Sequence, residues 1–128
     1  NLEDTIRGLA HGFTFCPVLI HYDMSLLVPR EIKYCLISIT KEALSNVIRH
    51  SNASQVRITL QEHPALYQLC VEDNGTRIAP GCLKAGSSQS GIGLTNIQER
   101  IQALNGNLQI SADSGFRIFI TIPKKEDL

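Results

Sequence analysis

Four side chains able to do chemistry recur at helical spacing along one stretch of the chain. They are a carboxylate, an amide, a cation and an imidazole, at Glu42, Asn46, Arg49 and His50. At about 100° per residue, steps of four, three and one place them within a sector of roughly 100°. A solvated helix face would show the same spacing. However, the surrounding stretch is poor in charge, since Lys41 and Glu42 are its only charges between positions 35 and 47.

Each of the four side chains suits a nucleotide site. Magnesium on a nucleotide takes most of its ligands from phosphate and water, so the amide oxygen of Asn46 could complete its shell. Glu42 could orient a magnesium-bound water or act as a general base. Arg49 would contact a phosphate or extend to solvent. His50 would stack on a base, or simply favour the negative end of the helix dipole.

A second candidate group follows an apolar strand, at Asp73 and Gly75. A carboxylate at the edge of the core could accept a hydrogen bond from an exocyclic amine such as N6 of adenine. Guanine presents a carbonyl there, so Asp73 would select adenine. Gly75 would let the base approach the backbone closely. Taken alone, Asp73-Asn74-Gly75 is more typical of a plain turn.

The third candidate group is Gly91-Ile92-Gly93-Leu94, which opens a helix. Free N–H groups and the helix dipole converge at such a start and favour phosphate. A dinucleotide fingerprint is excluded, because position 96 is Asn96 and no strand precedes the glycines. On its own this signal could also be a linker that caps a helix.

Hydrophobic periodicity predicts the elements that position these groups. A stripe of apolar residues and Pro29 in the first turn indicate a long helix over 31–50. We expect Gly106 to end the last helix in a left-handed conformation. Residues 76–90 read as a long loop that acts as a lid, and 123–128 as a polar tail. The expected elements are a helix over 2–13, a strand over 17–22, the long helix, a hairpin over 55–62 and 65–72, a helix over 91–104, and a hairpin over 108–112 and 116–122. This order predicts an α+β fold, a two-layer sandwich with a mixed, mostly antiparallel sheet and about three helices on one face.

Composition limits the other readings. The chain has 128 residues, 43% hydrophobic and 19% charged, which indicates a single folded domain. Twelve basic and twelve acidic residues balance, which argues against nucleic acid as a partner. The four cysteines and four histidines show no zinc spacing, and a reducing, cytoplasmic setting is favoured. The chain lacks an initiator Met and is expected to be part of a longer protein, whose other part could carry a membrane anchor.

The three groups together strongly resemble the catalytic ATP-binding domain of bacterial sensor histidine kinases, in the GHKL superfamily with DNA gyrase and the large heat-shock chaperone ATPases. The family's N box is matched by Glu42-x-x-x-Asn46-x-x-Arg49-His50-x-x-Ala53. Its G1 box is matched by Asp73-x-Gly75, and its G2 box by Gly91-x-Gly93-Leu94. The Arg-His ending, Glu99-Arg100 and the run from Gly115 to Pro123 are similar to the nitrate-sensor and degradation-sensor type. The resemblance covers about residues 15–123.

The resemblance implies a Bergerat-type fold and a set of roles. Asn46 would ligate Mg²⁺, and Glu42 would hold its water or assist the chemistry. Arg49 would touch phosphate, and His50 would line the base pocket. Asp73 would read adenine N6. Gly75 and Ile78 would lie beside the ring, and the backbone of Gly91, Gly93 and Leu94 would meet the phosphates.

The resemblance also implies an activity and partners. A domain spanning residues 1–128, with an N-terminal linker or helix over 1–14, the ATP lid over 76–90 and a tail over 124–128, would pass the γ-phosphate of ATP to a histidine on a separate dimerisation domain of the same kinase. A response regulator would act downstream, and the isolated domain is expected to be monomeric. His11 and His21 lack the acidic neighbour of the family's phospho-acceptor site, so the chain is expected not to phosphorylate itself alone.

Two positions depart from the family pattern and keep alternatives open. Arg77 replaces a second glycine of the G1 box, which could stiffen the lid or bring a cation near phosphate. Phe116 stands where many relatives place a threonine that helps to hold the adenine-reading aspartate, so support for Asp73 must come from elsewhere or is absent. One alternative is a regulatory interaction module without kinase activity. A separate alternative is a serine kinase of the anti-sigma-factor type, which the Arg49-His50 ending and Glu99-Arg100 disfavour.

Overall fold

The computed structural model describes residues 1–25, 27–75, 91–112 and 115–124, with backbone only for 91–96. Its helices and strands follow the order expected from the sequence. They are α1 (Leu2–Gly12), β1 (Val18–Asp23), α2 (Arg30–His50), β2 (Val56–Glu62), β3 (Leu66–Asp73), α3 (Gly91–Ala103), β4 (Asn107–Ser111) and β5 (Phe116–Pro123).

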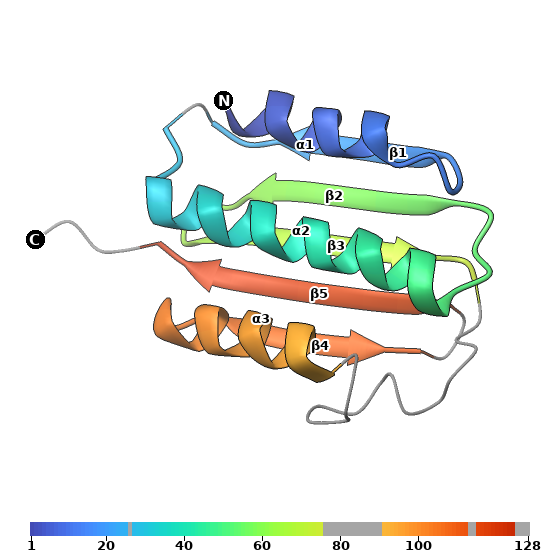
Figure 1. Cartoon of the computed structure of the whole chain (residues 1–128). Helices are drawn as coiled ribbons and strands as arrows, with labels where there is room; N and C mark the ends of the chain where they lie inside the picture. The colour runs from blue at the N-terminus through green and yellow to red at the C-terminus, as the bar shows by residue number, and fades with distance from the viewer. Residues whose placement is uncertain (26, 76–90, 113–114, 125–128) are drawn as a thin grey trace, which may run out of the picture.

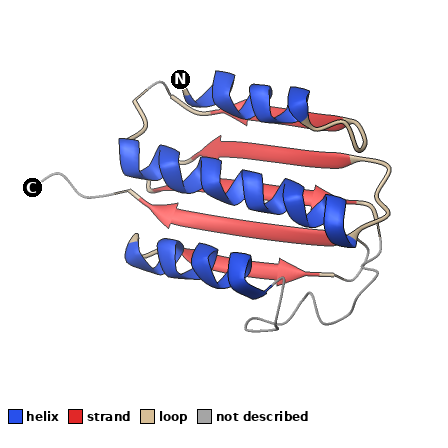
Figure 2. Ribbon diagram, in the orientation of Figure 1, coloured by secondary structure: helices blue, strands red, loops and turns tan. Residues whose placement is uncertain are grey.

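The five strands form one sheet in the order β1-β2-β3-β5-β4. Only β1 and β2 are parallel, and the other three neighbouring pairs are antiparallel. All three helices cover the same face of this sheet, with α2 in the middle and α1 and α3 on either side (Figure 1). Helices and strands therefore form two separate layers (Figure 2). The predicted α+β sandwich with a mixed, mostly antiparallel sheet is confirmed.

Alternating apolar residues decide which face of the sheet the helices cover. In β2 every second residue is fully buried, and the register aligns Ile58 with Val71 and Ile118 in one row across the sheet. The apolar stripe of α2 packs on such rows, since Ile32, Leu36, Ile39, Ala43 and Val47 are all buried. Because these residues take one side of α2, the charged residues of the helix, among them Glu42 and Arg49, are not buried.

The ends of α2 differ slightly from the expected ones. The helix begins at Arg30, and Pro29 is its N-cap rather than a residue of the first turn. The helix ends at His50, and the backbone N–H of Ser51 donates to the carbonyl of Val47 at 3.0 Å. Ser51 then turns to an extended conformation, which directs the chain toward β2.

The predicted cap of α3 is wrong in its residue. Asn105, not Gly106, adopts the left-handed conformation, with φ of 59°. The N–H groups of Asn105 and Gly106 donate to the carbonyls of Gln102 and Ile101, which is a Schellman motif. Gly106 is required for another reason, because a Cβ atom there would lie 2.7 Å from the Thr121 carbonyl oxygen. Asparagine tolerates positive φ better than most residues, so the glycine serves close packing instead.

The first two residues of the predicted polar tail belong to the folded structure. Pro123 is the last residue of β5. The backbone N–H of Lys124 donates to the Ala65 carbonyl, and its ammonium group pairs with Glu62 at 2.7 Å. Residues 125–128 lie outside the described residues.

Candidate functional site

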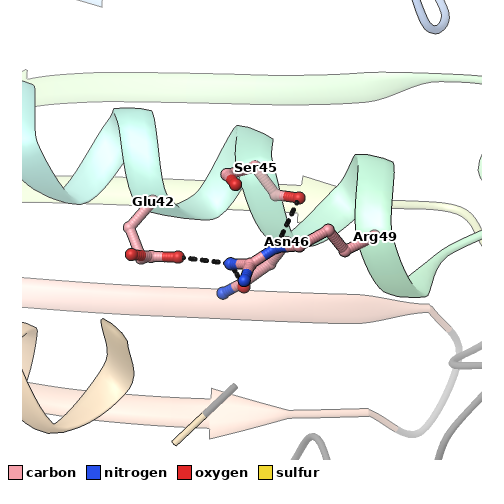
Figure 3. Close-up of polar contacts among 4 residues, drawn as sticks. All are labelled: Glu42, Ser45, Asn46 and Arg49. Atoms are coloured by element: carbon pink, nitrogen blue, oxygen red, sulfur yellow. Dashed lines mark hydrogen bonds and ion pairs between the residues drawn. The ribbon is translucent and has the colours of Figure 1, made fainter. Parts of the chain in front are cut away.

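Three of the four predicted side chains on α2 contact one another (Figure 3). The Nη2 atom of Arg49 donates to Glu42 Oε2 at 2.8 Å and to Asn46 Oδ1 at 2.8 Å. Its Nε atom donates to the Ser45 carbonyl at 3.4 Å. We call Glu42, Asn46 and Arg49 the cation cluster. The sequence left open whether Arg49 extends to solvent, and the structure places its guanidinium on the two oxygen-bearing neighbours.

The cation cluster lies at the boundary between core and solvent. Asn46 is buried, whereas the side chains of Arg49 and Glu42 are 45% and 26% exposed. One nitrogen contacts both oxygen atoms, so a carboxylate and an amide oxygen converge on a single cationic centre. Such oxygen donors suit Mg²⁺, which needs only one or two of them from protein when phosphate supplies others. The oxygen atoms of Glu42 and Asn46 therefore fit a nucleotide-bound Mg²⁺. In this structure the Arg49 guanidinium contacts the same two oxygens.

The predicted adenine reader lies at the end of β3. Asp73 is only 8% exposed and belongs to the row of residues that faces the helices. Its Oδ1 atom accepts hydrogen bonds from the Ser51 hydroxyl at 3.2 Å and from the Gly75 backbone N–H at 2.9 Å. The Ser51 oxygen in turn accepts from the Ala53 backbone N–H at 3.1 Å. We call Ser51, Ala53, Asp73 and Gly75 the aspartate knot.

Two glycines make room for the aspartate knot. A Cβ atom at Gly75 would overlap the Ser51 hydroxyl and lie 2.5 Å from the Ala53 nitrogen. A Cβ atom at Gly115 would overlap the carbonyl oxygen of Asp73, and Gly115 also has φ of +108°, which L side chains rarely adopt. The close approach at Gly75 is thus to the chain that follows α2. Asn74 lies between Asp73 and Gly75 in the sequence and holds the same loop. Its side-chain oxygen accepts hydrogen bonds from the backbone N–H groups of Ser54 and Gln55.

Ser51 is the residue that the sequence reasoning missed. The sequence left open which residue supports Asp73, because its partner in the sheet, Phe116, has no hydroxyl group. The hydroxyl comes instead from the C-cap of α2, five residues beyond Asn46. A small polar residue directly after His50, at an unspecified position of the N box, was the available signal. It could not be interpreted without knowing that the end of α2 meets the end of β3.

Other residues near the aspartate knot add to its surroundings. Burial, and then the negative charge of Asp73, raise the pKa of the Cys16 thiol, which keeps it protonated at neutral pH. A hollow of about 200 Å³ lies beside Asp73, but its lining residues Arg57 and Glu72 face the side of the sheet opposite the helices. We therefore do not assign that hollow as the binding site of a nucleotide base.

The remaining predicted site residues are only partly placed. Gly91 begins α3 as expected, and Gly93 and Leu94 lie in its first turn. His50 is the last residue of α2, and its Nε2 atom is buried. Ile78, Arg77 and the predicted lid over 76–90 lie outside the described residues. Within the described part of the chain, no three His, Cys, Asp or Glu side chains gather as a metal site.

Known structures share this arrangement of helices and strands. The histidine kinase domain of the blue-light activated histidine kinase from Erythrobacter litoralis EL346 superposes with a TM-score of 0.78 at 20% identity. The match covers 95% of this chain and 58% of that one. The fold is therefore the Bergerat fold of histidine kinase catalytic domains, as the resemblance implied.

Sequence comparison places the chain in a family. Residues 34–126 match the family described as histidine kinase-, DNA gyrase B- and HSP90-like ATPase, and the chain belongs to it. Proteins of this family generally bind ATP with Mg²⁺.

Curated relatives come from two-component signalling. The signal transduction histidine-protein kinase/phosphatase UhpB of Salmonella typhimurium is 36% identical over 90 residues, covering 70% of this chain and 17% of that protein. The nitrate/nitrite sensor protein NarX of Escherichia coli is 30% identical over 128 residues, covering 97% of this chain and 21% of NarX. The chain thus spans about a fifth of the length of these relatives. Among the helices of the described residues, none has the length and apolarity needed to cross a membrane.

Proposed function

We propose that the chain binds Mg-ATP and donates its γ-phosphate to a histidine on a separate dimerisation domain of a two-component sensor kinase. The cation cluster carries the proposal, because Glu42 and Asn46 bring two oxygen atoms onto one cationic centre, each at 2.8 Å. The match of residues 34–126 to the ATPase family supports it. A response regulator downstream, a monomeric isolated domain and a parent protein held at a membrane are part of the same proposal.

The phosphate end of the site would be served by α2 and by the start of α3. Bound Mg²⁺ would neutralise phosphate charge as the bond from the γ-phosphorus to ADP breaks and the bond to the histidine nitrogen forms. Asn46 would be the protein ligand of Mg²⁺, and Glu42 would orient a water or act as a base. Arg49 would leave their oxygens and contact a phosphate. The backbone N–H groups of Gly91, Gly93 and Leu94 would face the phosphates.

The base end would be served by the aspartate knot and its neighbours. Asp73 would accept a hydrogen bond from the exocyclic amine of adenine, and His50, Gly75 and Ile78 would lie beside the ring. Residues 76–90 would close over the nucleotide as the lid. The chain would thus supply positioning and fixed dipoles, which account for most of the catalysis in phosphoryl transfer.

Calorimetric titration with Mg-ATP and Mg-GTP tests nucleotide binding. We expect ATP to bind, GTP to bind at least about 100-fold more weakly, and Asp73→Asn to lose ATP affinity by a similar factor. The matched control is Asp23→Asn, which changes an exposed aspartate at the end of another strand and should bind ATP normally. Absence of ATP binding at millimolar concentration would refute the proposal in favour of a regulatory interaction module.

The acceptor is tested by adding a histidine-bearing dimerisation domain and ATP labelled at the γ-phosphate. A label on that domain that is lost in acid and kept in base indicates phosphohistidine. A label with the opposite stability would indicate a serine acceptor and replace the histidine kinase assignment with the anti-sigma-factor type.

A further inference from the structure

We propose that Ser51 is a positioning residue that sets the base selectivity of the site by orienting Asp73. The inference rests on the proposed function, in which Asp73 accepts a hydrogen bond from an exocyclic amine. Ser51 itself would not touch the nucleotide.

The hydroxyl of Ser51 has a defined direction. A hydroxyl has one proton to donate and lone pairs that accept. One lone pair is used by the Ala53 backbone N–H at 3.1 Å, and the proton is directed to Asp73 Oδ1 at 3.2 Å. Ser51 is 4% exposed, so water does not compete well for this hydroxyl. The chain of donors therefore runs one way, from backbone to hydroxyl to carboxylate.

Two donors on one carboxylate oxygen fix the orientation of the whole group. Asp73 Oδ1 accepts from the Ser51 hydroxyl and from the Gly75 N–H, which belong to two different segments, the C-cap of α2 and the turn after β3. Rotation of the carboxylate about its Cβ–Cγ bond would break both hydrogen bonds. We therefore assign Oδ1 to the protein and Oδ2 to the amine of the base. A carboxylate held in this way discriminates strongly between bases with and without the amine. It cannot rotate to form another hydrogen bond with a ligand that lacks the amine.

The origin of Ser51 links the two ends of the site. It is the C-cap of α2, and its backbone N–H is tied to Val47 next to the magnesium ligand proposed above. Phe116, the sheet partner of Asp73, carries no hydroxyl. The support that a threonine at that position would give thus comes from the helix.

The test is a cycle of two proteins and two ligands, measured by displacement of a fluorescent ATP analogue. The ligands are ATP and purine riboside triphosphate, which lacks the amine and adds no carbonyl. The ratio of their affinities measures the amine contact alone. We expect Ser51→Ala to reduce that ratio about ten-fold, the factor typical of one hydrogen bond to a charged group. Ser51→Thr, which keeps the hydroxyl, should restore most of it.

The matched control is Ser54→Ala, because Ser54 is a loop serine whose hydroxyl accepts from Asn74 and does not contact Asp73 in the structure. It should change the ratio by less than about two-fold, within the range of an exposed substitution. Where Ser51→Ala does not fold, Ser51→Cys keeps the size, donates weakly and carries the same test.

Two results with Ser51→Ala would overturn the inference while leaving ATP binding intact. One is an unchanged ratio in Ser51→Ala. The other is an equal loss of both ligands, which would mean that Ser51 only supports the fold. A wild-type chain that binds ATP but does not prefer it over the purine analogue would refute both the amine contact of Asp73 and the role of Ser51. Failure to bind ATP at all refutes the proposed function first.

Discussion

The cation cluster and the aspartate knot are held together in different ways, although one lies on α2 and the other includes the C-cap of that helix. In the cation cluster one long side chain, Arg49, makes the contacts, and it is 45% exposed. In the aspartate knot Ser51 and Asp73 are nearly inaccessible, and two of the donors are backbone N–H groups. Exposed ion pairs contribute little and rearrange easily, whereas buried hydrogen bonds are costly to break. In the proposed function, the base end of the site would therefore be built before a nucleotide arrives, whereas the cation end would have to exchange partners.

The largest effect is expected where a side chain is forced into the aspartate knot. Gly75→Ala should lower the free energy of unfolding by about 3 kcal/mol, because the new Cβ overlaps Ser51 and crowds the backbone of Ala53. Urea denaturation followed by circular dichroism measures it. The matched control is Gly8→Ala in α1, where a Cβ atom meets nothing within 4 Å. That change should stabilise the helix by about 0.5–1 kcal/mol. Equal stability of Gly75→Ala and the wild type would show that the knot is not rigid.

A smaller effect is expected in the cation cluster, on binding rather than on folding. Arg49→Gln should weaken binding of ATP without magnesium about ten-fold, since a cation that would contact phosphate is lost. The gain in affinity on adding Mg²⁺ should increase, because the guanidinium no longer holds the Glu42 and Asn46 oxygens. Titrations at several Mg²⁺ concentrations measure both.

The control for this prediction is Arg57→Gln, an exposed arginine of β2 on the opposite side of the sheet. It should leave the magnesium dependence unchanged. A drop in the stability of Arg49→Gln beyond about 1 kcal/mol would contradict the comparison, because the cluster would then be part of the folded scaffold.

The smallest effect calibrates what an ion pair of this kind contributes. Hydrogen bonds from Lys124 and from the Ser25 backbone lower the pKa of Glu62 from its ordinary value of 4.5. A lowered pKa in the folded state means that the pair stabilises the protein above that pH and loses its effect as the pH falls through the folded pKa. Glu62→Gln should cost about 0.5–1 kcal/mol at neutral pH.

The difference between Glu62→Gln and the wild type should shrink toward zero as the pH falls through the lowered pKa of the folded state. Urea denaturation at neutral and acidic pH measures this change. A cost that stays constant with pH would assign it to the position of the Lys124 ammonium group over the Tyr67 ring, whose centroid lies 5.3 Å away. The Glu42–Arg49 pair is more exposed, so it should contribute less than the pair at Glu62.

Much of the fold could be predicted because it is encoded locally. The alternation in β2 and the stripe of α2 are spacing patterns, and each names the buried face without knowledge of the partner. The α3 cap was misjudged for a related reason. Asparagine and glycine both tolerate the left-handed conformation of a helix cap. Only the close approach of Thr121 to position 106 decides that this position must be the glycine.

The candidate site likewise has a part that local sequence patterns predict and a part that depends on tertiary contacts. The sequence indicated that Asn46, Arg49 and Glu42 share one helix face and that Asp73 lies at the core edge. The contacts within α2 are three and seven residues apart, so helical geometry alone brings them together. The roles given to these residues, and to Ile78 and the glycines of α3, stay predictions until nucleotide binding is measured.

By itself the sequence determined the order of elements, the faces they bury and the family to which the chain belongs. Only the tertiary structure decided that Ser51 holds Asp73, which lies 22 residues away. It also decided that Gly75 is needed where the chain folds back on Ala53. Such contacts depend on where a helix end meets a strand end, which is fixed by the register of the sheet and the packing of α2 on it. No local pattern of residues encodes that meeting, because each partner alone is compatible with an ordinary turn.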